Sequence, residues 1–178
     1  MEKSLRFVTV CAGCVGAPLL ALGIGAPAAS AAPGVAVSVS GNDFGIGDAS
    51  ATSSTGNAAL AFNGGSADAS GSGVGNVAIA TGTDSEARVG NGNLNFVMAT
   101  GGSAAQVNNG NMNFVRATGG SEGQVNNGNR NVVLSGLNST SKVEGEGSGN
   151  IVATLCGGSV VTAQSAQIKT SAPCLGAP

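Results

Sequence analysis

The chain contains no histidine, tryptophan or tyrosine among its 178 residues. Without histidine, Ser-His-Asp and Cys-His catalytic arrangements are impossible, and so is a histidine-bound zinc site. The closest acidic pairs, Asp84 with Glu86 and Glu144 with Glu146, lie in Gly/Ser-rich segments and are interpreted as solvated turn charges. Glycosidases instead hold paired carboxylates across a sugar cleft. We therefore predict that the protein is not an enzyme and uses no cofactor.

Charge and aromatic side chains are also scarce. Charged residues make up 9% of the chain, aromatic residues make up 3%, and the net charge is −2. Nucleic-acid-binding proteins usually carry a basic patch, often beside aromatic stacking residues. Neither is present, so no nucleic-acid partner is expected. Sugar-binding sites also commonly offer aromatic stacking faces, which makes a glycan the less favoured partner.

The N-terminus has the pattern of a secretory signal peptide over residues 1–31. Lys3 and Arg6 precede an apolar stretch, and Ala29-Ser30-Ala31 is a small-residue cleavage site. Glycines and Pro18 interrupt the apolar stretch, which argues against a retained membrane anchor. We predict a mature chain that begins at Ala32, contains no membrane span, and is secreted to the extracellular space or the cell envelope.

Cysteine is present at four positions, two of them within the predicted signal peptide. Cys156 and Cys174 remain as an even pair in an oxidising compartment, where a disulfide is the default expectation. Such a bond closes 18 residues, a loop whose closure stabilises by about 3 kcal/mol. Because this loop follows the repeats, residues 156–178 are predicted to form a disulfide-closed C-terminal cap and tail folded back over the last repeat.

What the chain does contain is a repeat. Residues 90–107 are followed by a close copy at residues 108–125, and looser copies extend on both sides. One asparagine recurs at intervals of 18 or 19 residues, at Asn57, Asn76, Asn95, Asn113, Asn131 and Asn150. Small or β-branched residues follow it two and four places later. A valine column with 18-residue spacing runs through Val89, Val107, Val125 and Val143, with Val161 as its next member. A fixed period of this length indicates a repeat architecture.

The pattern after each asparagine alternates with period two, which predicts short β-strands. Gly-Gly-Ser and Asn-Gly sequences supply turns between them. One unit is too small to bury a core, so the units must stack, with one coil per repeat. We predict an all-β, single-domain β-solenoid (β-helix) of about 18–19 residues per coil over residues 57–155. Residues 32–56 are predicted to form an N-terminal strand and an irregular cap; a flexible tether over residues 32–75 is the alternative.

The facing of the strands follows from the arginines. Arg116 and Arg130 have the parity opposite to the asparagines, so we expect the asparagines and the small columns inside. Stacked asparagines can hydrogen-bond along the stack instead of remaining buried and unpaired. An apolar strip is then exposed as a candidate contact surface: Leu94, Phe96, Met98, Met112, Phe114, Val132 and Leu134. The alternative is the reverse facing, in which this strip is core.

Two ligand patterns are too incomplete to support a site. Residues 41–48 resemble the glycine- and aspartate-rich calcium repeats of toxin-type β-rolls, but the pattern occurs once and lacks its Gly-Gly opening. Thr81, Thr100 and Thr118 form a threonine column of the kind found in ice-binding solenoids, but the next copies abandon it. No metal site is expected.

Two parts of the sequence resemble known groups of proteins. The Ala-x-Ala-Ala-Pro region at residues 29–33, with the Gly/Ala/Asn-rich chain after it, resembles small secreted proteins of actinobacteria (mycobacteria and relatives). The unit at residues 92–99 and its copy at 110–117 are similar to the curlin repeat of bacterial functional amyloid, over about residues 56–143. The curlin resemblance implies a polymerising subunit. Most of curlin's glutamine rungs are missing here, with Gln106 and Gln124 the only aligned pair, which leaves polymerisation open.

The predicted function is that of a secreted, non-enzymatic structural or interaction protein that presents a rigid, repetitive β surface. Its expected partner is a second copy or another surface protein. The alternatives are a glycan- or host-surface-binding module and a curlin-type amyloid subunit. Regular exposed asparagine rungs would favour the glycan, whereas dependence of assembly on Phe96 and Phe114 would favour self-association.

Overall fold

The computed structural model describes residues 34–171, which form two β-sheets. The predicted signal peptide and Cys174 lie outside the described residues. Sheet A has nine strands: β1 (Val35–Val39), β2 (Asn42–Ile46), β4 (Ala58–Phe62), β6 (Val77–Thr81), β8 (Phe96–Thr100), β10 (Phe114–Thr118), β12 (Val132–Gly136), β14 (Ile151–Leu155) and β16 (Ile168–Thr170). Sheet B has seven: β3 (Ser50–Ser53), β5 (Ser66–Ala69), β7 (Glu86–Asn91), β9 (Ala104–Asn109), β11 (Glu122–Val125), β13 (Thr140–Val143) and β15 (Ser159–Thr162).

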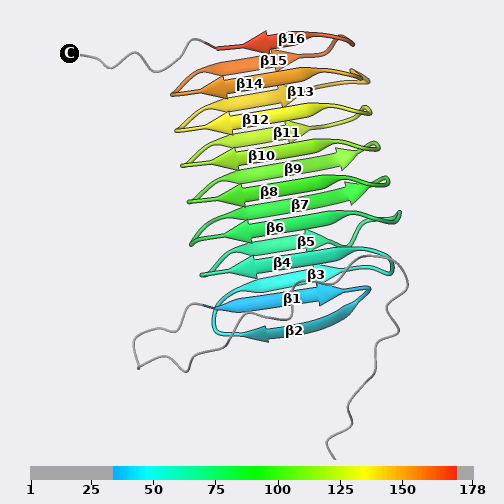
Figure 1. Cartoon of the computed structure of the whole chain (residues 1–178), viewed down its shortest axis with the longest axis vertical. Helices are drawn as coiled ribbons and strands as arrows, with labels where there is room; N and C mark the ends of the chain where they lie inside the picture. Colours follow the sequence, from blue (N-terminus) through cyan, green and yellow to red (C-terminus); the bar gives the residue numbers. More distant parts are fainter. Residues whose placement is uncertain (1–33, 172–178) are drawn as a thin grey trace, which may run out of the picture. The chain divides into compact units, whose positions relative to one another are not determined.

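The chain winds between the two sheets. From β3 onward, successive strands alternate between sheet B and sheet A, and each pairs in parallel with the equivalent strand of the next coil (Figure 1). The predicted all-β solenoid is therefore confirmed, with about 7 turns. Coils are stacked in register, so that Val97 pairs with Val115 and Val115 with Val133. The sequence period of 18–19 residues is the length of one coil.

The N-terminal segment begins with a strand, as predicted, but two further strands, β2 and β3, lie where an irregular cap was predicted. β1 pairs antiparallel with both β2 and β4, so a hairpin extends sheet A by two strands. β3 pairs in parallel with β5, although it lies within residues 32–56, where the irregular cap was predicted. The alternative of a flexible tether is wrong for residues 35–69, which contain β1 to β5. Alternating small side chains let this Ser/Ala/Thr-rich segment pack on the core as the later coils do.

The C-terminal segment also differs from the prediction. β15 pairs in parallel with β13, and β16 with β14, so residues 159–170 continue the stack instead of folding back over it. Val161 does not continue the valine column, because it pairs with Lys142 and is 44% exposed. Thr162 pairs with Val143 and is buried in its place. The extra residue in this coil shifts the alternation by one, which turns the valine outward.

The core is narrow and made of small side chains. Every buried hydrophobic residue in the described part of the chain is alanine or valine. The asparagines and the small columns lie inside, while the strip from Leu94 to Leu134 lies outside. The alternative in which that strip is core is wrong. Small residues permit two sheets to approach closely across a coil of this length, and larger ones would force the sheets apart.

Candidate interaction surfaces

The six predicted asparagines form a buried ladder along one edge of the solenoid, where the chain passes from sheet B to sheet A. Asn113 shows the pattern: its Oδ1 accepts the backbone N–H and the Nδ2 of Asn131, at 3.0 and 3.1 Å. Its Nδ2 donates to Asn95 Oδ1 at 3.1 Å and to Gly128 O at 2.9 Å. All four hydrogen-bonding positions of this amide are filled within the chain, so the ladder is structural.

A column of glycines makes this ladder possible. Gly92, Gly110 and Gly128 have φ of 123°, 126° and 126°, a region that residues with a side chain rarely adopt. A Cβ on Gly110 would lie 1.8 Å from the carbonyl oxygen of Gly128 in the next coil. These glycines let the coils approach closely enough for the asparagine amides to reach the glycine carbonyls of the next coil.

The outer face of sheet A carries apolar side chains along its whole length, well beyond the predicted strip, with Thr81, Thr100 and Thr118 in a column along one margin. Its outward side chains line up in columns because the parallel strands are in register. One column contains Ala58, Val77, Phe96, Phe114, Val132, Ile151 and Ile168; the next contains Leu60, Ile79, Met98, Arg116, Leu134, Ala153 and Thr170. The hairpin adds Val37 and Phe44 to the second column. We call this surface the sheet A face.

The centre of the sheet A face has the largest side chains. The rings of Phe96 and Phe114 stack with centroids 5.3 Å apart and planes within 5°. Phe114 is 37% exposed, and Phe96 and Met98 are half-buried. Arg116 is the single charged side chain among the outward residues of the described strands of sheet A. Flat, contiguous apolar surface of this kind marks a contact site.

The outer face of sheet B is polar. Lys142 Nζ lies 2.8 Å from Glu122 Oε1 on the neighbouring strand. Arg88 lies 3.4 Å from Glu86 and 3.9 Å from Asp68. Gln106 and Gln124, the pair aligned with curlin's glutamine rungs, are cross-strand neighbours on this face. The solenoid therefore has one mainly apolar and one polar side, although both sheets share the same core.

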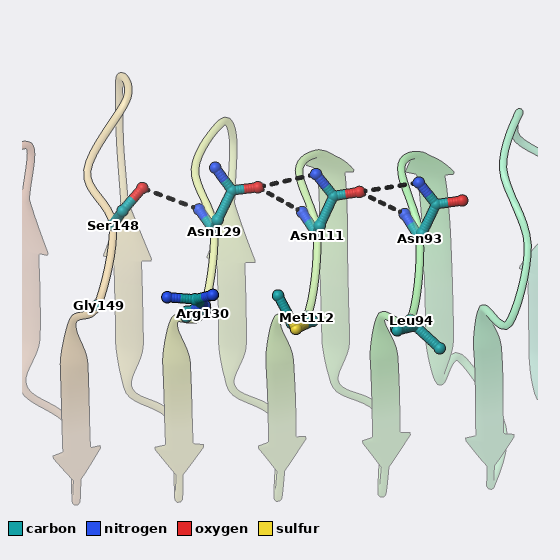
Figure 2. Close-up of a pocket in the computed structure, with 8 residues that line it drawn as sticks. All are labelled: Asn93, Leu94, Asn111, Met112, Asn129, Arg130, Ser148 and Gly149. Carbon is teal, nitrogen blue, oxygen red and sulfur yellow. Dashed lines mark hydrogen bonds between the residues drawn. The ribbon is translucent and has the colours of Figure 1, made fainter.

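A second asparagine ladder is exposed on the same edge as the buried one. Asn93, Asn111, Asn129 and Ser148 occupy equivalent positions in four successive coils and line one side of a shallow groove (Figure 2). Asn111 Oδ1 accepts the backbone N–H of Asn93 at 2.8 Å and its Nδ2 at 3.0 Å. Beside it, Asn91 donates to Asn109 and Asn109 donates to Asn127 through side-chain amides, at 3.1 and 3.0 Å. The edge thus presents regular rungs of exposed amides.

The other side of this groove consists of residues in an unusual conformation. Leu94, Met112 and Arg130 have φ of 57°, 56° and 57°, in the left-handed region. Gly75 and Gly149, at the same position in flanking coils, have φ of 74° and 70°. A non-glycine residue in this conformation costs about 1–2 kcal/mol. The three central coils therefore have a strained residue at a position where the flanking coils have glycine. Two of these residues, Leu94 and Met112, are 62% and 45% exposed.

Both ends of sheet A carry a charged residue at an inward position. Asp43 on β2 pairs with Ser38, whose side chain is buried, and accepts a hydrogen bond from its hydroxyl. Lys169 on β16 pairs with buried Val152, and its Nζ donates to Val161 O at 3.2 Å. Inward-pointing charges on edge strands oppose the addition of further strands, because stacking would bury them.

The acidic and cysteine side chains that the structure describes do not gather into a metal site. Within residues 34–171, no group of three or more His, Cys, Asp or Glu side chains could hold a metal ion. The same residues include no helix long and apolar enough to cross a membrane. Cys156 lies in the turn after β14, and because Cys174 is outside the described residues, their disulfide stays a prediction.

Comparison with known proteins finds no family model that matches this chain, no similar curated protein and no similar solved structure. The resemblances to actinobacterial secreted proteins and to curlin therefore stay predictions from the sequence.

Sequence reasoning missed three features of these surfaces. It limited the apolar surface to seven residues, although the same outward parity continues through Ile79 and Ile151 in neighbouring coils. It treated the serines of the Gly-Gly-Ser turns as turn residues only. Ser103 and Ser121 are in fact buried beneath the turn, and Ser121 Oγ donates to Ser135 O of the next coil at 2.9 Å. It also did not recognise the exposed ladder, whose 18-residue recurrence of asparagine was the available signal.

Proposed function

We propose that this protein is a secreted, non-enzymatic interaction protein that associates with a second copy of itself through the sheet A face. The observation that supports this most directly is the asymmetry of the solenoid: one outer face is almost uncharged and the other is polar. A soluble rod gains little from an apolar face unless something covers it.

A second copy fits this face better than a charged partner does. The face offers a single charged side chain, Arg116, so it has little with which to attract or orient a charged surface. Two copies related by a two-fold axis would bury the same face against itself, which is how most homodimers are built. Their polar sheet B faces would remain in water. The two-sided character of the rod therefore favours a closed dimer over open-ended aggregation.

The size of the face is sufficient for a specific interface. Nine strands at about 4.8 Å spacing make it roughly 40 Å long, and five residues per strand make it roughly 15 Å wide. Two such faces bury on the order of 1,200 Å² in total, which is near the lower limit of stable protein–protein interfaces. We therefore expect a dimer that dissociates at accessible concentrations.

The test is sedimentation velocity on the secreted chain over a range of concentrations. Replacing both rings, Phe96→Ser with Phe114→Ser, removes the stacked centre of the face and is expected to shift the dimer to monomer. The matched control is Gln106→Ser with Gln124→Ser, which changes the neighbouring pair on sheet B of the same coils and should leave the dimer intact. Far-UV circular dichroism checks that each variant keeps its β spectrum.

Because serine at two ring positions could affect folding, Ile79→Lys is a second variant. Ile79 lies on the same face, pairs with Leu60 and Met98, and places a charge on the face without emptying its centre. It should also yield monomer. A wild-type chain that stays monomeric at high concentration would refute the proposal, as would dimers that persist in both face variants. Binding of the wild-type monomer to lipid vesicles instead would assign the face to a membrane surface.

Growth end to end, as in the curlin alternative, is disfavoured by Asp43 and Lys169. Each would become a buried charge if another coil were added to sheet A, and such burial is costly unless the charge is well paired. Replacing both by valine should allow fibres to form, detected by electron microscopy after prolonged incubation. Fibres from the wild-type chain under the same conditions would show that these charges do not block the ends.

A further inference from the structure

We infer that the groove along the exposed asparagine ladder binds a linear, uncharged polysaccharide in extended form. This inference goes beyond the proposed self-association and concerns a different surface, the edge of the solenoid between its two sheets. The groove is open along the solenoid axis and crosses four coils (Figure 2). A ligand that fits it must be a chain whose chemistry repeats.

The side-chain N–H groups of the ladder that donate no hydrogen bond within the chain determine which groups the ligand must supply. Asn93 Nδ2 donates one of its two N–H groups to Asn111 Oδ1, and Asn111 Nδ2 donates one to Asn129 Oδ1. Both acceptor oxygens also receive the backbone N–H of the donor residue. Asn111 therefore has its oxygen occupied twice and retains one N–H. Asn93 Nδ2 also retains one N–H, while the Asn93 oxygen accepts the backbone N–H of Val74. The groove wall is a row of donors, which suits ligand hydroxyl oxygens.

The spacing of the amide donors and the charge of the groove lining further restrict the class of ligand. The donors recur once per coil, at the spacing of adjacent β-strands, about 4.8 Å. This repeat is close to the length of one sugar residue in an extended polysaccharide, so successive sugars can meet successive rungs. The lining contains one cation, Arg130, and no acidic residue. A charged polymer would leave most of its charges without partners, whereas a neutral one needs only the amides.

The opposite wall supplies apolar contact. Leu94 and Met112 are largely exposed at backbone positions at which flanking coils have glycine, and the Leu94 side chain lies over Gly75 of the preceding coil. A left-handed position filled by an exposed leucine or methionine gains nothing in core packing, and retained strain of this kind is typical of functional sites. Their side chains are placed to contact the apolar C–H faces of sugar rings, in a chain that has few aromatic residues for that role.

The experiment is a binding titration of the secreted chain with three hexasaccharides, monitored by isothermal calorimetry and by the side-chain amide signals of ¹⁵N-labelled protein. Linear β-1,4-linked glucose and β-1,4-linked N-acetylglucosamine are the extended probes, and α-1,6-linked glucose is the flexible comparison. We expect binding of at least one extended probe, with shifts in the amide signals of Asn93 and Asn111, and much weaker binding of the α-1,6-linked chain.

The variants separate binding from folding. Met112→Gly should weaken binding at least fivefold while leaving the unfolding midpoint unchanged or higher, because glycine relieves the left-handed strain. Asn111→Ala should weaken binding at least tenfold. Gln124→Ala, on the sheet B face, is the matched control and should bind as the wild type does.

Three results would overturn the inference: no binding of either extended probe by the wild-type chain, equal binding of all three hexasaccharides, or wild-type affinity in Met112→Gly and Asn111→Ala. The variant with serine at positions 96 and 114 should bind the probes normally. Failure of self-association and failure of polysaccharide binding are therefore distinguishable.

Discussion

The two asparagine ladders on one edge of the solenoid differ by only two positions in each coil. Asn113 is buried, whereas Asn111 is half-buried and in contact with solvent. The buried amide accepts from the following coil, whereas the exposed amide accepts from the preceding one. The Asn113 amide also donates to the carbonyl of Gly128, so all of its hydrogen-bonding positions are filled. The same residue type at the same period therefore holds the coils together in one ladder and remains available to a ligand in the other.

This difference arises from burial. A buried amide that loses a partner cannot replace it with water, so each lost hydrogen bond costs the full desolvation of the group left behind. An exposed amide exchanges its partner for water at little cost. The comparison predicts unequal effects of equal substitutions, and the following changes test it in order of decreasing effect.

Gly110→Ala should be the most destabilising change. Its Cβ would lie 1.8 Å from Gly128 O and 2.9 Å from Asn113 Nδ2, at a φ of 126°. Overpacking and backbone strain together predict a loss of about 4 kcal/mol in the free energy of unfolding, measured by urea titration. Gly149→Ala is the control, since nothing lies within 4 Å of its Cβ; it should cost about 1 kcal/mol. Equal losses would mean that the close approach of coils is not needed.

Asn113→Ala tests the comparison directly against Asn111→Ala. Removing the buried amide takes away the side-chain partners of the Asn131 N–H and the Gly128 carbonyl, so we expect a loss of about 3 kcal/mol. The exposed variant should lose less than about 1 kcal/mol, because water replaces its hydrogen bonds. Urea unfolding of both proteins gives the two values. Similar losses would contradict the assignment of a structural role to the buried ladder alone.

Met112→Asn tests whether the left-handed conformation at position 112 lowers the stability of the protein. Asparagine tolerates the left-handed conformation that Met112 adopts at a φ of 56°. The variant should therefore be more stable by about 0.5 kcal/mol, seen as a higher midpoint in thermal unfolding. Asn113→Met, which places methionine at the neighbouring buried position, should be strongly destabilising. A loss of stability in Met112→Asn would show that the methionine packs more than its exposure indicates.

Lys142→Met should have the smallest effect. The ion pair of Lys142 with Glu122 lies on the exposed sheet B face, where such pairs contribute less than about 1 kcal/mol. Thermal unfolding at low and high salt should give nearly the same midpoint for the variant and the wild type. A large loss that disappears at high salt would indicate that the outer face of sheet B contributes to stability as the inner columns do.

Much of the coil was predictable because a repeat makes equivalent positions visible. The spacing of Asn95, Asn113 and Asn131 predicted the coil length, and the parity of Arg116 predicted which side chains face inward. The same logic failed at Val161, where one inserted residue reversed the alternation. It also failed after Leu155, because the weakened repeat and the cysteine suggested a cap where β15 and β16 continue the sheets.

The sequence by itself determined the period, the alternation and the small size of the inward residues, and these are sufficient to specify a narrow stacked coil. Tertiary structure decided which positions of neighbouring coils meet. Only stacking places Phe96 against Phe114, extends the sheet A face over nine strands, and joins Asn93 to Asn111. The physical reason is that each of these contacts joins residues one full coil apart, and the geometry of the connecting arcs determines which of two similar asparagines is buried.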